Sequence, residues 1–212
     1  MYNLDFTLLP DMSRGSVRTA SGENTSRKLS VLTQTFDRAQ SAMQLAYYLN
    51  SVETFFSHAD SKLRESFLRA SLAEFVSMEE TLIRDLKRNG ITNKSIIKAT
   101  DSANPLLHIV RELRNLEIHL HSSSIHTSRT KFYLPHQTEP DKDLEIDLDI
   151  WFIGDISITD FKHLRNSKRY NNNDIVDMLN WFNKSQKIYG IHEILRMAIQ
   201  EYSELIITFY GF

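Results

Sequence analysis

The sequence predicts a mainly α-helical protein: a bundle of four long helices with a small β-hairpin inserted between the third and the fourth helix. Three observations support this fold class. Apolar residues recur every three or four positions over most of the chain, as the buried face of a helix requires. Between about residues 128 and 154 the spacing changes to every second position, which is typical of strands. The 212 residues are 41% hydrophobic and 25% charged, the balance of one ordinary globular domain.

Composition also restricts the function. The chain contains no cysteine, which excludes disulfides and thiolate metal sites. No apolar run approaches the ~20 residues of a membrane span, and the first residues do not resemble a secretory signal. These features favour a cytoplasmic protein with no membrane partner. Because the formal charge is -2, any contact with nucleic acid must depend on a local basic patch.

The N-terminal region is expected to form an arm over residues 1–29 that is partly disordered. Residues 11–27 contain many Ser, Thr, Arg and Gly residues and show no periodicity, so a loop is the simplest interpretation. A single domain then covers residues 30–212. Its first helix is expected from about Ser30 to Phe56, where one face carries Leu32, Phe36, Ala39, Met43, Ala46, Tyr47 and Val52.

Capping residues mark the next two helices. The second helix is expected to begin near Asp60 or Ser61, whose side chains can accept hydrogen bonds from free amides, and to end at Asn89 and Gly90. The third helix is expected to follow Asn104, with a proline in its first turn, where the missing amide hydrogen costs nothing.

Two half-buried strands are expected in the insertion at about 128–154. The polar face of the first strand carries Arg129 and Lys131, and the polar face of the second is acidic. We therefore expect a hairpin that pairs opposite charges. An EF-hand calcium loop does not fit this acidic run, since Leu148 occupies the sixth position, where a glycine is required. The acidic residues of the second strand are Asp143, Glu145, Asp147 and Asp149.

A basic segment precedes the last helix. A solvated turn is the more ordinary interpretation of this segment, and a clamp for RNA is the alternative. The last helix is expected to run from about Asp174 to Tyr210, with Gly190 as a weak point inside it. The positively charged residues of the segment and its histidine are Lys162, His163, Arg165, Lys168 and Arg169.

The third helix carries the residues that indicate a function. Successive helical residues are about 100° apart, which gives this helix an apolar core face and a polar stripe opposite it. The stripe contains few of the lysines and glutamates that make an ordinary helix soluble. The core face comprises Leu106, Ile109, Val110, Leu113, Leu116 and Leu120, and the stripe comprises His108, Arg111, Glu112, Asn115 and His119, with Arg114 at its edge.

Arg114, Asn115 and His119 form the pattern R-N-x-x-x-H, whose residue types suit cleavage of RNA without a metal. The imidazole of His119 titrates near neutral pH and can act as an acid or a base. The guanidinium of Arg114 stays charged and offers a planar fork to phosphate oxygens. Asn115 lies one turn before His119 and can orient the imidazole or bind the substrate.

R-N-x-x-x-H late in one helix, after a helix such as that from Phe67 to Leu86, resembles the HEPN domain. This all-α module is found in many prokaryotic ribonuclease toxins and antiviral proteins. The resemblance covers about residues 30–120 and the final helix, and the strands at 128–153 and the N-terminal arm lie outside the common pattern. It implies a HEPN-like bundle and an RNA substrate, with an antitoxin or defence protein as a further partner and no cofactor. In that family, an arginine and a histidine from two copies meet across a two-fold interface.

The helix geometry also favours a homodimer. Residues five apart are about 140° apart around the axis, so Arg114 and His119 of one chain diverge. A second copy can bring the arginine of one chain to the histidine of the other. Leu107 and Ile118 flank the stripe and are expected to pack against the partner copy. Arg111 and His108 are the expected substrate-binding residues beside the motif, Arg111 sharing the phosphate role.

Two structural alternatives stay open for the third helix. In the first, Arg114 forms a surface ion pair with Glu112 or Glu117, and His119 packs near the helix end. In the second, His119 contributes to a metal site with His121 and His126, although two histidines spaced H-x-H on a helix diverge by about 200°. The corresponding functional alternative is a non-catalytic helical dimer that binds a nucleotide, RNA or another protein.

Overall fold

The computed structural model describes residues 1–10, 20–51, 57–92, 94–119, 125–135 and 143–212. This part of the chain is mainly helical and has one small antiparallel sheet, which confirms the predicted fold class at that level. The elements are, in chain order, η1 Phe6–Leu8, α1 Ala20–Leu29, α2 Thr33–Ser51, α3 Ser57–Arg88, η3 Ala99–Asp101, α4 Pro105–His119, β1 Ile125–Pro135, β2 Asp143–Ile153, α5 Ile158–Lys162, η4 Arg165–Arg169, α6 Asn172–Tyr189 and α7 Ile191–Tyr210.

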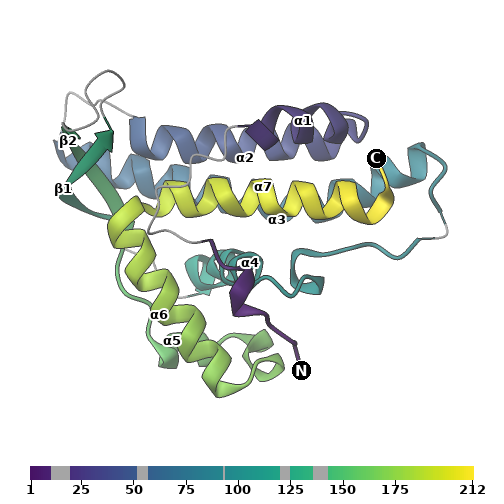
Figure 1. Ribbon diagram of the computed structural model, residues 1–212. Helices are drawn as coiled ribbons and strands as arrows, with labels where there is room; N and C mark the ends of the chain where they lie inside the picture. The colour runs from purple at the N-terminus through teal and green to yellow at the C-terminus, as the bar shows by residue number, and fades with distance from the viewer. Residues whose placement is uncertain (11–19, 52–56, 93, 120–124, 136–142) are drawn as a thin grey trace.

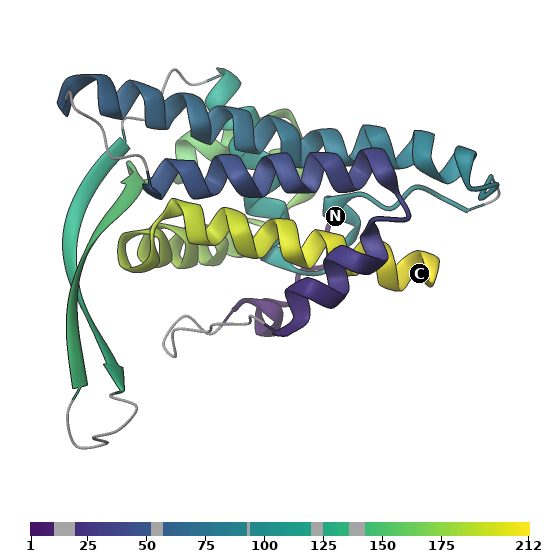
Figure 2. The same cartoon turned by 90° about the horizontal axis from the view of Figure 1, so that it is seen from above.

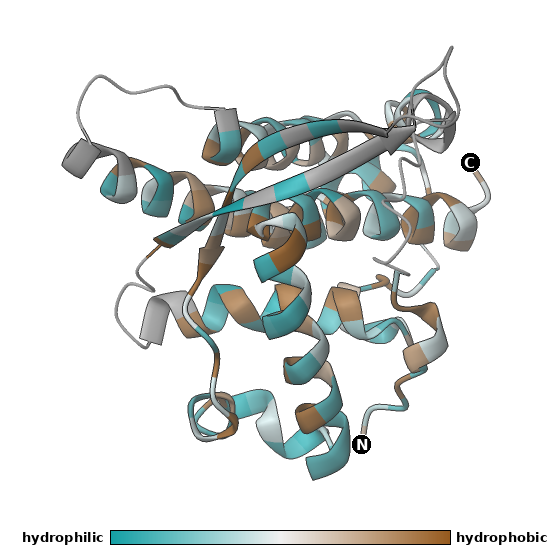
Figure 3. Cartoon of the chain, turned by 60° about the vertical axis from the view of Figure 1, so that its left-hand side comes forward, coloured by the Kyte–Doolittle hydropathy of each residue, from teal (hydrophilic) through white to brown (hydrophobic). Residues whose placement is uncertain are grey.

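Three long helices, α2, α3 and α7, run alongside one another, and α4 and α6 pack beneath them (Figure 1). Hydrophilic and hydrophobic residues alternate along the helices in Figure 3, as expected for amphipathic helices that share a core. The core contains Phe75 and Met78 of α3, Phe182 of α6 and Tyr202 of α7, all fully buried. The predicted core face of α4 is confirmed for its described side chains, because Leu106, Ile109, Val110, Leu113 and Leu116 are buried.

The start of the bundle differs from the prediction. The helix expected from about Ser30 to Phe56 is α2, which begins at Thr33, and residues 52–56 lie outside the described part; a further helix, α1, precedes it. The expectation of a loop over residues 11–27 is wrong for residues 20–27, which belong to α1, and residues 11–19 are not described. Tertiary packing explains α1: Leu29 is buried, and Thr25 donates a hydrogen bond to Glu204 of α7 over 3.4 Å.

The predicted end of the second helix and the predicted start of the third helix are confirmed, whereas the second helix, α3, begins at Ser57 and not near Asp60 or Ser61. Gly90 has a φ of 74° just after α3, the left-handed conformation that favours glycine after a helix. Asn104 caps α4, since its Oδ1 accepts a hydrogen bond from the amide of Leu106 over 3.0 Å. The motif helix is therefore fixed at its first turn.

The expected last helix is two helices joined at Gly190. This glycine has a φ of 83°, and the chain changes direction sharply between α6 and α7 (Figure 1). A Cβ atom at this position would lie 2.6 Å from Nδ1 of His192, so only glycine fits without a shift. The weak point expected at residue 190 is in fact a corner.

The hairpin forms as predicted and projects from one end of the helical layers as a twisted ribbon (Figure 2). Arg129 lies opposite Asp149 and Lys131 lies opposite Asp147, while the ion pairs run diagonally, from Arg129 to Asp147 over 3.7 Å and from Lys131 to Glu145. At the base, the guanidinium of Arg64 stacks 3.8 Å from the ring centroid of Trp151, and the Ile153 amide donates to Gln186 over 3.0 Å.

We expect the variant Asp147→Asn/Asp149→Asn to stay folded and, if the protein cleaves RNA as the sequence predicts, to cleave it at the wild-type rate. Opposite charges across a hairpin contribute only about 0.2 to 1 kcal/mol per pair, and these side chains are exposed. Thermal unfolding and cleavage rates of the variant and the wild-type protein test this expectation. A folded variant without activity would instead place the functional site on the hairpin.

No helix in the described part of the chain has both the length and the apolar character that a membrane span requires.

Candidate functional site

The motif lies in the second half of α4. Arg114 and Asn115 are partly buried, and His119 is the last residue of the helix. The side chains of Glu117, Ile118 and His119 lie outside the described part, as do residues 120–124 with His121. The described part of the site comprises Arg114, Asn115 and the residues that surround them.

A buried carboxylate holds Asn115. Glu112 has no exposed surface, and its Oε2 accepts a hydrogen bond from Nδ2 of Asn115 over 2.8 Å. Its Oε1 accepts a second hydrogen bond from Nδ2 of Asn166, in η4, over 3.0 Å. Glu112 thus joins the motif helix to the basic segment that precedes α6. Because the two amides occupy both carboxylate oxygens, the Asn115 side chain is fixed in one orientation.

Arg114 makes no ion pair within the described part of the chain. Among the described residues, no acidic side chain lies within ion-pair distance of its guanidinium, and its Nε is buried without a hydrogen-bond partner. The alternative of an ion pair between Arg114 and Glu112 is wrong, because the carboxylate is occupied by Asn115 and Asn166. A buried, unpaired donor is costly, and a bound anion would relieve that cost.

The polar stripe does not face solvent along its whole length. His108 is fully buried, with its ring centroid 4.7 Å from that of Tyr2. Its Nε2 donates to the carbonyl oxygen of Ser102 over 2.8 Å, which leaves Nδ1 to accept from the hydroxyl of Tyr170 over 3.1 Å. The expectation of an open stripe is wrong here, since the N-terminal segment and Tyr170 cover this part of α4.

Burial sets the protonation of the covered groups. It lowers the pKa of the His108 imidazole, so the ring is neutral at neutral pH, in agreement with its two hydrogen bonds. Burial also raises the pKa of the Tyr170 phenol, and the negative charge of Glu112 adds to this effect. The phenol therefore stays protonated and can donate to His108.

Arg111 is engaged with α3. Its Nε lies 3.5 Å from Oε1 of Glu79, and the same carboxylate oxygen accepts a hydrogen bond from the amide of Ala99 over 3.2 Å. The pair connects α4, α3 and the loop before α4. Arg111 therefore serves the packing of the motif helix in this structure.

Leu107 does not lie on a free surface. The residue is 1% exposed and belongs to the hydrophobic core, so the expectation that it packs against a second copy is wrong. The helical wheel placed it at the boundary of the core face, and α7 and the segment before α4 extend the core over that boundary. The divergence of Arg114 and His119 remains the argument for a dimer.

No group of three side chains suitable for binding a metal ion occurs within the described residues. Of the three histidines considered for zinc, only His126 has a described side chain, and it is exposed at the start of β1. The side chains of His119 and His121 lie outside the described part, and chelation with EDTA tests the metal alternative.

The sequence contained a signal for one part of this network and none for the rest. Glu112 lies three residues before Asn115, and residues at this spacing are neighbours on a helix surface. Asn166 and Tyr170 lie more than 50 residues further along the chain, and the chain offers no local pattern that predicts their contact with α4. The element that seats them, η4, lies in the segment interpreted as a turn or an RNA clamp.

We expect the stability of the protein to fall as the pH decreases from about 7 towards 5. The folded-state pKa of His108 is depressed, so the unfolded state binds more protons below the ordinary histidine pKa of about 6.5. The stability from burying the neutral ring is present above that pH and is lost below it. Burial lowers the pKa of His192 in the same direction. Urea unfolding at several pH values measures the effect.

The variant His108→Gln should show a weaker decrease than the wild-type protein, because the buried imidazole of His108 has been removed and only the contribution of His192 remains of the two. His163→Gln is the matched control, since His163 is exposed and its replacement should leave the decrease unchanged. Equal slopes for the wild-type protein and His108→Gln would contradict the assignment.

Comparison with known proteins finds no matching family model, no similar curated protein and no similar solved structure for this chain.

Proposed function

We propose that the chain is a metal-independent endoribonuclease that acts as a toxin or as an effector of antiviral defence. The observation that supports this proposal most directly is the contrast between two adjacent residues of α4. The buried Glu112 fixes Asn115, while Arg114 has no acidic partner among the described residues. A fixed amide beside an available guanidinium is suited to holding a phosphate group.

In the proposed reaction, the ribose 2′-oxygen attacks the adjacent phosphorus, and the bond from phosphorus to the 5′-oxygen breaks. A base removes the proton of the 2′-hydroxyl, and an acid protonates the departing 5′-oxygen. We assign acid–base catalysis to His119, stabilisation of the phosphorane to Arg114, and orientation of the imidazole or the substrate to Asn115. The products are a 2′,3′-cyclic phosphate and a 5′-hydroxyl end.

The proposal places two equivalent composite sites at the contact of two copies, each formed by Arg114 of one copy and His119 of the other, since these two residues of one helix diverge. It gives Arg111 and His108 a supporting role in place of the substrate contact expected from the sequence. Arg111 is paired with Glu79, and His108 is fully buried between Ser102 and Tyr170. Both residues hold α4 in position beneath the motif.

Incubation of the purified protein with total RNA in the presence of EDTA tests the proposal. We expect cleavage that persists in EDTA and fragments that carry 2′,3′-cyclic phosphate and 5′-hydroxyl ends. Activity that disappears with EDTA and returns with a divalent ion would overturn the mechanism in favour of a metal site. RNA binding without cleavage would favour the non-catalytic binding module.

A further inference from the structure

The segment from Phe161 to Tyr170, which we call the basic segment, is seated on the protein at every third position. Phe161, Leu164, Ser167 and Tyr170 are buried. Side chains three residues apart eclipse each other in a 3₁₀-helix, and η4 accounts for half of this segment. The buried side chains at every third position therefore lie on one side of the segment, and the side chains between them lie on the other side.

Every intervening position but one carries a positively charged residue or a histidine. Lys162, Arg165, Lys168 and Arg169 are exposed. Among the described residues, none of the first three has an acidic side chain within ion-pair distance. Between residues 158 and 170 the only carboxylate is Asp160, which instead accepts a hydrogen bond from the hydroxyl of Ser157 over 2.7 Å. A chain of formal charge -2 thus concentrates positive charge on one short segment.

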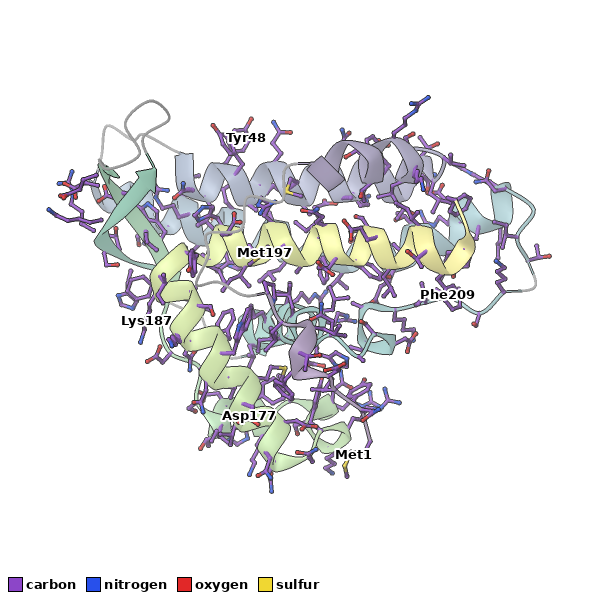
Figure 4. The ribbon with its side chains drawn as sticks, in the orientation of Figure 1. Met1, Tyr48, Asp177, Lys187, Met197 and Phe209 are labelled. Atoms are coloured by element: carbon purple, nitrogen blue, oxygen red, sulfur yellow. The ribbon has the colours of Figure 1, made fainter. Side chains whose placement is uncertain are left out.

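The remaining position joins the segment to the motif. Asn166 donates to Oε1 of Glu112, whose other oxygen holds Asn115. Two hydrogen bonds, from Asn166 to Glu112 and from Asn115 to Glu112, therefore connect the basic segment to the motif. The far end is also fixed: the Tyr2 amide donates to the Arg169 carbonyl over 2.7 Å. Figure 4 shows Met1 in the same lower region of the molecule as Asp177 of α6.

We propose that the basic segment binds the phosphate backbone of single-stranded RNA and leads it to Arg114. Three cations without an acidic partner among the described residues, Lys162, Arg165 and Lys168, supply the contacts, spread over roughly 12 Å at about 2 Å per residue. This inference rests on the proposed ribonuclease function for the nature of the ligand. Its evidence is separate, since it comes from the exposure, the charge and the anchoring of the segment.

Charge reversal provides the test. The variant Lys162→Glu/Arg165→Glu/Lys168→Glu removes the three cations without changing a buried residue. Lys28→Glu/Lys87→Glu/Lys184→Glu is the matched control, with the same change of net charge at exposed lysines of α1, α3 and α6. The probe is a fluorescent single-stranded 2′-O-methyl RNA, which lacks the attacking hydroxyl and reports binding without cleavage. DNA of the same sequence is the second probe.

We expect the basic-segment variant to bind the RNA probe at least tenfold more weakly than the wild-type protein at about 0.1 M salt. The affinity of the control variant for the same probe should differ from that of the wild-type protein by less than about threefold. Each lost phosphate contact on a single strand lowers the slope of log affinity against log salt by about 0.7, so the slope should fall by about 2. An equal loss on DNA would show contacts to phosphate alone, and a larger loss on RNA would add contacts to the ribose.

Equal binding by the basic-segment variant and the control would overturn the inference, as would absence of binding by the wild-type protein. The triple glutamine variant at the same positions replaces the glutamate variant if circular dichroism shows the latter unfolded. The proposed function can fail separately. If the wild-type protein binds the probe through the basic segment but does not cleave natural RNA, the binding surface is supported and the ribonuclease function is refuted. If the wild-type protein cleaves RNA and both variants bind the probe equally, the role of the basic segment is refuted and the proposed ribonuclease function is kept.

Discussion

His119→Ala is expected to abolish RNA cleavage, with a loss of at least about 100-fold, the size of an acid–base contribution to catalysis. Without this imidazole, the second half of the motif helix has no side chain whose ordinary pKa lies near neutral pH. His108 cannot substitute, because it is fully buried and both of its ring nitrogens are engaged. Initial rates of cleavage of a defined RNA by the folded variant, measured at pH 7 in EDTA, give the result.

Cleavage rates of Arg114 variants test the second catalytic role, the stabilisation of the phosphorane. Arg114→Ala should be nearly as severe as His119→Ala, and Arg114→Lys should restore only part of the activity, since an ammonium lacks the two-pronged contact with phosphate oxygens. Asn115→Ala should be milder. His126→Ala is the control, because His126 is exposed at the base of the hairpin and outside the motif. Wild-type rates for His119→Ala would refute the mechanism.

Local patterns in the sequence predicted much of the fold. Asn104 and Pro105 marked the start of α4, and Gly90 marked the end of α3, since capping depends on residues within one turn of the helix end. The opposite charges of Arg129 and the acidic strand predicted the hairpin pairing. Each of these features is decided by neighbours in the sequence or by a short-range pairing.

Features that depend on distant parts of the chain could not be predicted in this way. The polar face of α4 looked solvent-exposed because the wheel shows one helix alone, whereas Tyr2 and Tyr170 bury His108. The helix over residues 20–27 depends on the contact of α1 with α7, in a stretch without periodicity. The candidate site shows the same division, since the motif was visible in the sequence and the carboxylate bridge from Asn115 to Asn166 was not.

Two inactive variants are expected to restore activity when they are combined. If Arg114 of one copy and His119 of the other form each site, a mixed dimer of Arg114→Ala and His119→Ala contains one intact site and one doubly altered site. Random pairing of equal amounts makes half of the dimers mixed, so about one quarter of the wild-type rate should return. The variants are unfolded together, refolded together and assayed at the same total concentration as the wild-type protein.

The double variant Arg114→Ala/His119→Ala, mixed in equal amount with the wild-type protein, separates the composite arrangement from independent sites. With composite sites, every mixed dimer is inactive, and only the wild-type pairs, about one quarter of all dimers, contribute to the rate. With independent sites, each wild-type copy stays active, and about half of the rate remains. Light scattering at micromolar concentration establishes that dimers form. A monomer with full activity would contradict the composite site, because a single helix directs Arg114 and His119 to different sides.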